Sequence, residues 1–335
     1  MTEPTPQEQI NRLITGYWAS QAIYAAAKFG IADLLNDGPR SVDALAEASS
    51  TNADALYRLL RALASIGVFE EHDERTFSLT PLAETLRSDI RGSQRALAMM
   101  SGDEFFLAWS EIAHSIQTGE TAFGKVFGKP VFEYLGQNPE KGRIFDEAMT
   151  GIHGRETSAV LDAYDFSGIE VLADVGGGNG SNIAAILEKH PAMTGILFDL
   201  APVVERADAR IRTSRLSERC QLVAGNFFVS VPQGADAYLM RHIIHDWDDE
   251  RSLRILRNCH TAMPDGGKLL VIESVIPPGN DPFAGKFLDL VMLLIPGGRE
   301  RTEQEYRLLF EKAGFELTRI VPTRTEMSIV EGVRR

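Results

Sequence analysis

Cysteine is scarce in this sequence: only Cys220 and Cys259 occur among 335 residues. Two isolated cysteines cannot form the disulfide framework of a small secreted protein, and they lack the paired spacing of zinc ligands. Long apolar runs are also missing, since no stretch approaches the roughly 18 residues that a membrane-spanning helix needs. The N-terminal segment is polar and acidic, without the apolar core of a signal peptide. We therefore expect a cytoplasmic protein without a membrane partner.

Positive charge is in deficit. Lys and Arg number 34 against 47 Asp and Glu, which gives a net charge of −13. Neutralising phosphates requires clustered cations, so we expect no nucleic-acid partner. The remaining composition, 44% hydrophobic and 24% charged, is that of an ordinary globular protein, and the length predicts two domains.

The first hundred residues have a helical pattern that is interrupted once. Small and apolar residues recur at three- and four-residue spacing over 17–35, which predicts a helix. Ser41 and Asn52 stand where two further helices would need N-caps, and Gly67 stands where the second would end. The segment 68–83 then alternates like two short strands around a charged turn. Helix, turn, helix and hairpin together are typical of a winged helix.

Winged helices often bind DNA through their second helix. In this sequence that helix offers only Arg58 and Arg61 as cations, and the turn "EEHDER" is mainly acidic. The charge balance therefore favours a protein-interaction domain over a DNA-binding one.

From residue 168 onward, short β-rich runs alternate with helical segments, after a stretch of further helices over 101–167. The alternation predicts a parallel sheet with helices on both faces. We expect an α/β protein with a mainly helical winged-helix domain over 1–100, a helical connector over 101–167 and a Rossmann-like domain over 168–335. The strand-like runs are "VLADVGG", "TGILFDL", "CQLVAGNF", "DAYLMRHI" and "GKLLVIESVIP".

A glycine-rich turn follows the first of these runs. Gly176, Gly178 and Gly180 can bring the backbone against a ligand, and Asp199 ends the next strand, where an acid can accept hydrogen bonds from both ribose hydroxyls. NAD is the common ligand of such turns, but the third glycine comes one residue early, and the charge of Asp174 would oppose a pyrophosphate. S-adenosylmethionine, a cationic nucleoside without phosphate, fits better. A turn that binds no ligand is less favoured, because Asp199 also stands about twenty residues after the glycines, where a ribose-binding acid is expected.

The segment 241–252, "RHIIHDWDDERS", follows the predicted fourth strand of the sheet. The carboxyl ends of such strands are where open α/β sheets bind ligands. His242 and His245 could be metal ligands, but no cysteine or third histidine stands nearby in the sequence. Asp248 or Asp249 is explained as the N-cap of the following helix. We therefore predict no metal site and assign His242 a structural role.

Five ordered motifs carry a resemblance that covers essentially the whole chain. Together they resemble the class of O-methyltransferases that includes the plant caffeic acid and flavonoid enzymes, animal hydroxyindole O-methyltransferase and bacterial antibiotic-tailoring enzymes. The resemblance implies methyl transfer from S-adenosylmethionine, leaving S-adenosylhomocysteine, to a hydroxyl of a small aromatic acceptor in secondary metabolism. It also implies a homodimer formed through the winged-helix domain. The motifs are "DVGGGNGS", "FDLAPVVERA", "GNFFVSVPQGADAYLMRHIIHDWDDERSLRILRNC", "GGKLLVIESVIP" and "PGGRERTEQEYRLLFEKAGF".

The resemblance implies a set of cofactor contacts, of which two depart from the usual family residues. Asn226 replaces an aspartate near the adenine amino group; its amide oxygen can still accept, without the charge-assisted contact. Arg241 stands where the family usually has lysine. The implied contacts are Asp174, Gly176, Gly178, Gly180, Asp199, Leu200, Gly225, Asn226, Phe227 and Arg241.

His245 matches the general base of this class. A phenol has a pKa near ~10 and is rarely ionised at pH 7, whereas an imidazole with a pKa near ~6.5 is mostly neutral there and can take the proton. Glu273 and Glu300 match the two acids that bracket the histidine; without the resemblance, both would be taken for solvated surface charges.

Substrate contacts are the least specific part of the resemblance. Two methionines align with thioethers that clamp a flat acceptor, while Trp109 and Phe145 fit a plain core equally well. Three alternatives stay open: a member that binds the cofactor for other chemistry, an N- or C-methyltransferase, and a metabolite-sensing winged-helix regulator. The candidate substrate residues are Trp109, Phe145, Met149, Asp246, Asp289 and Met292.

Overall fold

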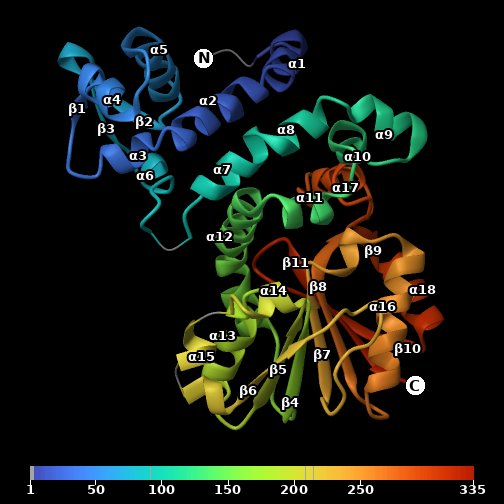
Figure 1. Cartoon of the computed structure of the whole chain (residues 1–335). Coiled ribbons are helices and arrows are strands. Elements are labelled where there is room, and N and C mark those ends of the chain that lie inside the picture. The colour runs from blue at the N-terminus through green and yellow to red at the C-terminus, as the bar shows by residue number, and fades with distance from the viewer. Residues whose placement is uncertain (1–3, 91, 208, 214) are drawn as a thin grey trace. The chain divides into compact units, whose positions relative to one another are not determined.

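The computed structural model describes residues 4–90, 92–207, 209–213 and 215–335 (Figure 1). Its chain forms two compact units: Met1–Glu111 with Val126–Gly154, and Ile112–Lys125 with Arg155–Arg335. The segment 101–167, expected as a connector, is divided between the two units.

The first unit contains the helices and short strands of the N-terminal region. Two helices, α10 (Ala122–Phe127) and α12 (Pro139–Ala163), run across the division between the units. The other elements of the first unit are α1 (Pro6–Ile14), α2 (Tyr17–Lys28), α3 (Ile31–Leu34), β1 (Arg40–Ser41), α4 (Val42–Ser49), α5 (Ala53–Ala64), β2 (Phe69–His72), η1 (Asp73–Arg75), β3 (Thr76–Leu79), α6 (Pro81–Glu84), α7 (Arg95–Gly102), α8 (Glu104–Trp109) and α11 (Val131–Gln137).

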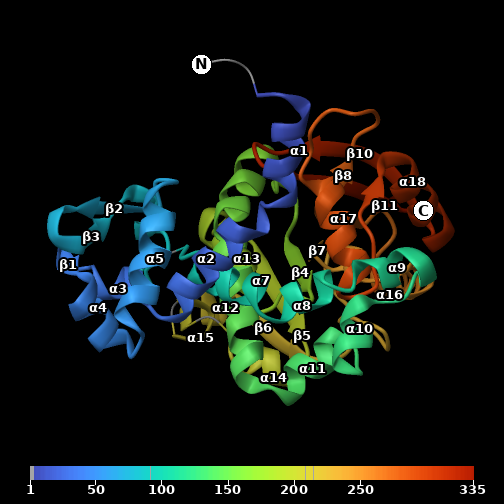
Figure 2. The ribbon, with the colours of Figure 1, turned by 90° about the horizontal axis from the view of Figure 1, so that it is seen from above.

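The predicted winged helix is present in this unit. The side chains of Ser41 and Asn52 cap α4 and α5 by accepting from backbone amides, as their positions predicted. Helix α5 ends at Ala64, and Gly67, with φ +80°, turns the chain into β2. Strands β2 and β3 form the hairpin beside α5, and β1 extends it to a sheet of order β1-β3-β2 (Figure 2).

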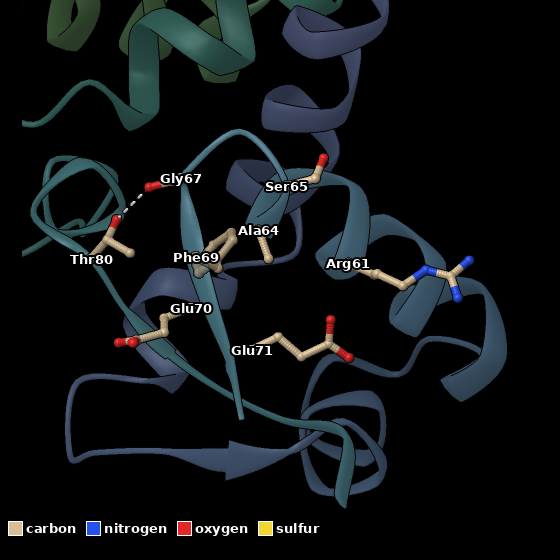
Figure 3. A pocket seen from close by; sticks show the side chains of 8 residues that line it. All are labelled: Arg61, Ala64, Ser65, Gly67, Phe69, Glu70, Glu71 and Thr80. Carbon is tan, nitrogen blue, oxygen red and sulfur yellow. Dashed lines mark hydrogen bonds between the residues drawn. The ribbon is translucent and has the colours of Figure 1, made fainter. Parts of the chain in front are cut away.

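An open hollow of about 630 Å³ lies over α5 and the hairpin (Figure 3). Its charged lining consists of Arg61 against Glu70 and Glu71, and Glu71 accepts a hydrogen bond from Tyr57. None of the residues predicted for cofactor, acceptor or base lines this hollow.

The second unit is an α/β domain. Its elements are α9 (Ile112–Thr118), β4 (Val171–Val175), α13 (Ser181–Lys189), β5 (Thr194–Asp199), α14 (Ala201–Val204), α15 (Ala209–Thr213), η2 (Arg215–Glu218), β6 (Cys220–Ala224), β7 (Ala237–Arg241), η3 (Ile244–Asp246), α16 (Asp249–Ala262), β8 (Lys268–Ile276), α17 (Gly285–Leu294), β9 (Arg301–Thr302), α18 (Glu303–Ala313), β10 (Phe315–Pro322) and β11 (Met327–Arg334).

All five predicted strands are present as β4 to β8, and they run parallel. The order along the sheet is β6-β5-β4-β7-β8-β11-β10, with β9 beside β8. The antiparallel β10–β11 hairpin was not predicted, and it makes the sheet mixed at one edge. Apolar clusters on both faces pack the sheet against α16 and α18 on one side and α12 and α13 on the other, as a doubly covered sheet requires (Figure 1).

The strand order reverses between β4 and β7, which are neighbours in the sheet. Open α/β sheets bind ligands at the carboxyl ends of strands at such a reversal. The glycine turn follows β4 and the histidine segment follows β7, so two motifs far apart in the sequence meet at one edge. Their contact is close: a Cβ added to Gly176 would lie 2.5 Å from Cδ1 of Ile243.

Candidate functional site

The glycine turn is shaped by backbone geometry. Gly176, Gly178 and Gly180 have φ of +70°, +61° and +78°, a region that L side chains rarely adopt. A Cβ on Gly180 would collide with Ile211, whereas the space beside Gly178 is open. The Gly178 amide donates to Oδ2 of Asp199 at 2.8 Å, so the acid at the end of β5 holds the turn in place.

Asp174 lies beneath this turn and is 2% exposed. Burial raises the pKa of its carboxyl to about 7; the charge of Arg241 opposes the shift and that of Asp199 adds to it. Its Oδ2 is buried without a hydrogen-bond partner among the described residues. A carboxylate oxygen in this state favours a nearby cation over a phosphate.

Arg241, at the end of β7, is largely buried near this acid. Its Nη1 donates to Oγ1 of Thr157 at 2.7 Å, and its charge interacts with Asp174 and with Glu156 on α12. Burial lowers the pKa of the guanidinium, while both acids oppose that shift. The arginine in place of the family's lysine therefore ties α12 to the base of the glycine turn.

The segment after β6 forms the other side of the turn. A Cβ on Gly225 would meet the ring of Phe198 at 2.4 Å, and Phe227 lies beside Gly176. Asn226 is exposed, and its Oδ1 accepts from the amide of Phe228 at 2.9 Å. That oxygen retains a second lone pair for a ligand. Leu200, after β5, is 52% exposed.

The imidazole of His245 lies in η3 and is 5% exposed. Its Nδ1 is 2.6 Å from Oε1 of Glu300, and its Nε2 is 3.6 Å from Oδ1 of Asp246. Because the carboxylate of Glu300 can only accept, Nδ1 carries the proton of this pair and Nε2 is the basic nitrogen of the neutral ring.

The surroundings of His245 shift the pKa of its imidazole from the ordinary value. Burial alone would lower the pKa of His245, but the surrounding carboxylates, led by that of Glu300, outweigh it and raise the pKa to about 10. Burial in turn raises the pKa of Asp246 to about 7 and also raises that of Glu300, which His245 opposes. The surrounding acids therefore favour the imidazolium form of the ring.

Glu273 and Glu300 act on His245 differently, although both were expected to flank the ring. Glu300 contacts the ring itself. Glu273 accepts at Oε1 from three successive backbone amides, those of Ile243, Ile244 and His245, at 3.2, 2.6 and 3.1 Å. The hydrogen bonds of Glu273 thus fix the loop.

Three residues of this loop's surroundings were not predicted. Arg301, 1% exposed, donates to the carbonyls of Ile244 and Trp247, and the Tyr306 hydroxyl donates to Glu273. A Cβ on Gly298 would lie 1.9 Å from the carbonyl oxygen of His245. All three stand in the motif that contains Glu300, but nothing in their spacing relates them to a segment more than fifty residues upstream.

The side chain of His242 reaches Glu156 on α12. Its φ of +55° is unusual for a residue with a side chain, and its Nε2 is 2.9 Å from Oε2 of Glu156. Asp248, as predicted, is the N-cap of α16. Among the residues that the structure describes, no group of three or more His, Cys, Asp or Glu is arranged for a metal ion, and no helix is long and apolar enough to cross a membrane.

The candidate acceptor residues fall into two groups. Asp246, Asp289 and Met292 belong to the second unit, where Oδ1 of Asp289 accepts from the Glu300 amide at 2.8 Å and Met292 is 7% exposed. The first unit holds the other three; Phe145 and Met149 pack against its helix-lined core cluster, and Trp109 is half-buried.

The glycine turn with Asp174 and Asp199 and the buried pair of His245 and Glu300 thus lie at one edge of an α/β sheet, the place where such sheets bind ligands. The family described as the O-methyltransferase domain matches residues 109–316, and the O-methyltransferase dimerisation domain matches residues 11–89. The chain belongs to this O-methyltransferase family.

Individual proteins agree with this assignment. The phenazine O-methyltransferase PhzM of Lysobacter antibioticus is 48% identical over 320 residues, 96% of this chain and 94% of that protein. The crystal structure of LaPhzM superposes with a TM-score of 0.96 at 46% identity, covering 99% of this chain and 100% of that one. An O-methyltransferase from neocarzinostatin biosynthesis was solved with S-adenosylmethionine and 2-hydroxy-5-methyl naphthoic acid. It superposes with a TM-score of 0.84 at 34% identity, covering 94% of this chain and 96% of that one.

Proposed function

We propose that this chain methylates a hydroxyl of a small, flat aromatic compound, with S-adenosylmethionine as donor and His245 as general base. The observation that carries the proposal is the contact of Nδ1 of His245 with Oε1 of Glu300 at 2.6 Å, at the same sheet edge as the glycine turn. The related phenazine and naphthoic acid enzymes support a flat acceptor.

The residues at the turn fit S-adenosylmethionine. The unpartnered Oδ2 of Asp174 provides a negative site for a cation, Asp199 lies where ribose hydroxyls would bind, and Gly178 leaves open space. When bound, the cofactor supplies an electrophilic methyl group on a positively charged sulfur.

The base then acts on the acceptor hydroxyl. In its neutral form His245 would take the hydroxyl proton at Nε2, and the cofactor, when bound, would supply the methyl group to that oxygen. The raised pKa of His245 makes the ring a stronger base than an ordinary imidazole, which favours proton transfer from a phenol. The same shift lowers the fraction of neutral rings at pH 7, and a cationic cofactor nearby favours the neutral form.

We propose further that the enzyme is a cytoplasmic homodimer joined through its N-terminal domain. Helix α1 has no buried residue and exposes Ile10, Leu13 and Ile14 at 52, 77 and 63%. Such a face needs a partner. Both cysteines are buried and unpaired, which suits a reducing compartment.

The test compares His245→Gln with the wild type on a panel of a hydroxyphenazine, 2-hydroxy-5-methyl naphthoic acid and an aminophenazine. We expect kcat on a phenol to fall by about 10²–10⁴-fold while calorimetry gives unchanged S-adenosylmethionine affinity. Methylation of the amine alone would refute hydroxyl transfer, and unaltered turnover by His245→Gln would refute the base.

A further inference from the structure

The loop that carries His245 is held from both sides of its backbone. On the amide side, Oε1 of Glu273 accepts from the N–H groups of Ile243, Ile244 and His245. The other oxygen of Glu273 accepts from the hydroxyl of Tyr306, which reaches it from α18. Glu273 and Tyr306 are both 0% exposed, so neither can exchange these partners for water.

On the carbonyl side, the guanidinium of Arg301 donates hydrogen bonds to the backbone of the loop. Nη1 donates to the carbonyl of Ile244 at 3.2 Å and Nη2 to that of Trp247 at 3.1 Å. Nη2 also donates to Ser252 Oγ at 3.2 Å and to Asp249 Oδ1 at 2.8 Å, which joins the loop to the start of α16. A planar donor with several N–H groups suits such a span, and the single ammonium of lysine does not reproduce it.

These contacts concern a base whose direction decides the reaction. Misplacing a reacting group by 1 Å can cost about 10²-fold in rate. Glu300 fixes the ring nitrogen, but it cannot fix the backbone from which the ring projects. That backbone turns sharply, because His242 has φ +55°.

We propose that Tyr306 and Arg301 are positioning residues of the His245 base: Tyr306 acts through Glu273 on the loop amides, and Arg301 acts directly on the loop carbonyls. Neither residue touches the acceptor or the cofactor in this scheme. The inference rests on the proposed role of His245 and deepens it.

The arrangement also has an electrostatic consequence. The hydroxyl of Tyr306 disperses the charge of Glu273, whose negative charge raises the pKa of His245. Without that hydroxyl the pKa of His245 rises further. Because the base must be neutral, the acid limb, which is the rise of kcat with pH on the acidic side of the pH profile, then moves to higher pH. The charged or titratable groups around the ring, which set the limb together, are Glu300, Asp246, Glu273, His242, Asp289, Asp249 and Arg301.

The decisive experiment pairs Tyr306→Phe with Tyr238→Phe in the full-length enzyme. Tyr238 is an equally buried tyrosine in the same apolar cluster, and its hydroxyl donates to the carbonyls of Pro232 and Ala262. Both variants lose one buried hydroxyl and keep the ring. We measure thermal unfolding, cofactor affinity by calorimetry, and kcat and KM for the hydroxyphenazine across pH.

We expect similar losses of thermal stability from both. Only Tyr306→Phe should lower kcat, by about 10- to 100-fold, with KM and cofactor affinity within twofold and the acid limb moved upward. Equal kcat for the two variants, or an unmoved limb in Tyr306→Phe, would show that Tyr306 has only a structural role and overturn the proposal.

Arg301→Lys provides a second variant that keeps the charge, with Arg307→Lys as control; Arg307 is 53% exposed and pairs with Glu303. We expect a comparable loss of kcat in Arg301→Lys alone, with faster hydrogen exchange at the amides of residues 243–247. Wild-type exchange at these amides together with wild-type kcat would contradict a positioning role for Arg301, even if Tyr306→Phe did not fold. His245→Gln separates the two hypotheses, because its full activity would refute the base itself rather than its positioning.

Discussion

The two loops at the reversal of strand order are built in different ways. The turn after β4 owes its shape to three glycines with positive φ and to one acid, Asp199, that ends the neighbouring strand. The loop after β7 has a single positive φ, at His242, and it is held by side chains from β8, from β9 and its flank, and from α18.

The difference separates two tasks. A turn made of backbone amides can bind a mobile nucleoside through small groups and tolerate some adjustment. A proton acceptor must point in one direction, and rigid direction comes from buried side chains that hydrogen bonds hold in place. We therefore expect damage to the turn to reduce cofactor affinity and damage to the base loop to reduce turnover.

The largest expected contrast is between Glu300→Gln and Asp199→Asn. Glu300→Gln removes the charge paired with His245 and should lower kcat by about 10²–10³-fold, with cofactor affinity unchanged. It also moves the acid limb to lower pH, opposite to Tyr306→Phe, because the pKa of the ring falls. Asp199→Asn should weaken cofactor binding by about 1.5–3 kcal/mol. Calorimetry and steady-state kinetics of both variants test this, and equal effects on kcat and affinity would erase the distinction between the loops.

A smaller contrast concerns two glycines. Gly298→Ala sets a Cβ against the His245 carbonyl, so the backbone must move, and we expect a loss of about 3 kcal/mol in unfolding free energy together with lower kcat. The added Cβ of Gly178→Ala would enter open space, so only the φ of +61° opposes it, and we expect a loss of about 1 kcal/mol in unfolding free energy. Urea denaturation measures both; an equally large loss in Gly178→Ala would mean that the turn is as tightly packed as the base loop.

A further expected effect is on the dependence of stability on pH. The folded-state pKa of Asp174 is raised from 3.8 to about 7 and that of His245 from 6.5 to about 10. In both cases the stabilisation is complete below the unfolded value and is lost as pH rises through the folded one. The contribution of Asp174 in the turn is thus lost between about pH 4 and 7, as is that of Asp246 in the base loop, and the contribution of His245 is lost between about pH 6.5 and 10. The measurement is the free energy of unfolding as a function of pH. Asp174→Asn should reduce its slope in the first pH window, and His245→Gln should reduce it in the second. A slope below pH 7 that Asp174→Asn leaves unchanged would contradict the first assignment.

Much of the fold could be read from short-range pattern. The caps Ser41 and Asn52, the hairpin after Gly67 and the five parallel strands each depend on residues within one element or its immediate neighbours. The hairpin β10–β11 was missed, although its strands, "FELTRIVP" and "MSIVEGVR", are β-rich, because its edge position appears only when it pairs with β8.

The sequence by itself determined the glycine turn, the acid at the end of β5 and the position of His245 after β7, because these depend on local conformation and on the fixed direction of parallel strands. Only the tertiary structure decided the state of the base. The raised pKa of His245 depends on Glu300 and Glu273, 55 and 28 positions away in the chain, as well as on the adjacent Asp246, and its loop is held by Glu273, Tyr306 and Arg301. These charges and hydrogen bonds act on His245 or its loop only after burial has removed water from between them.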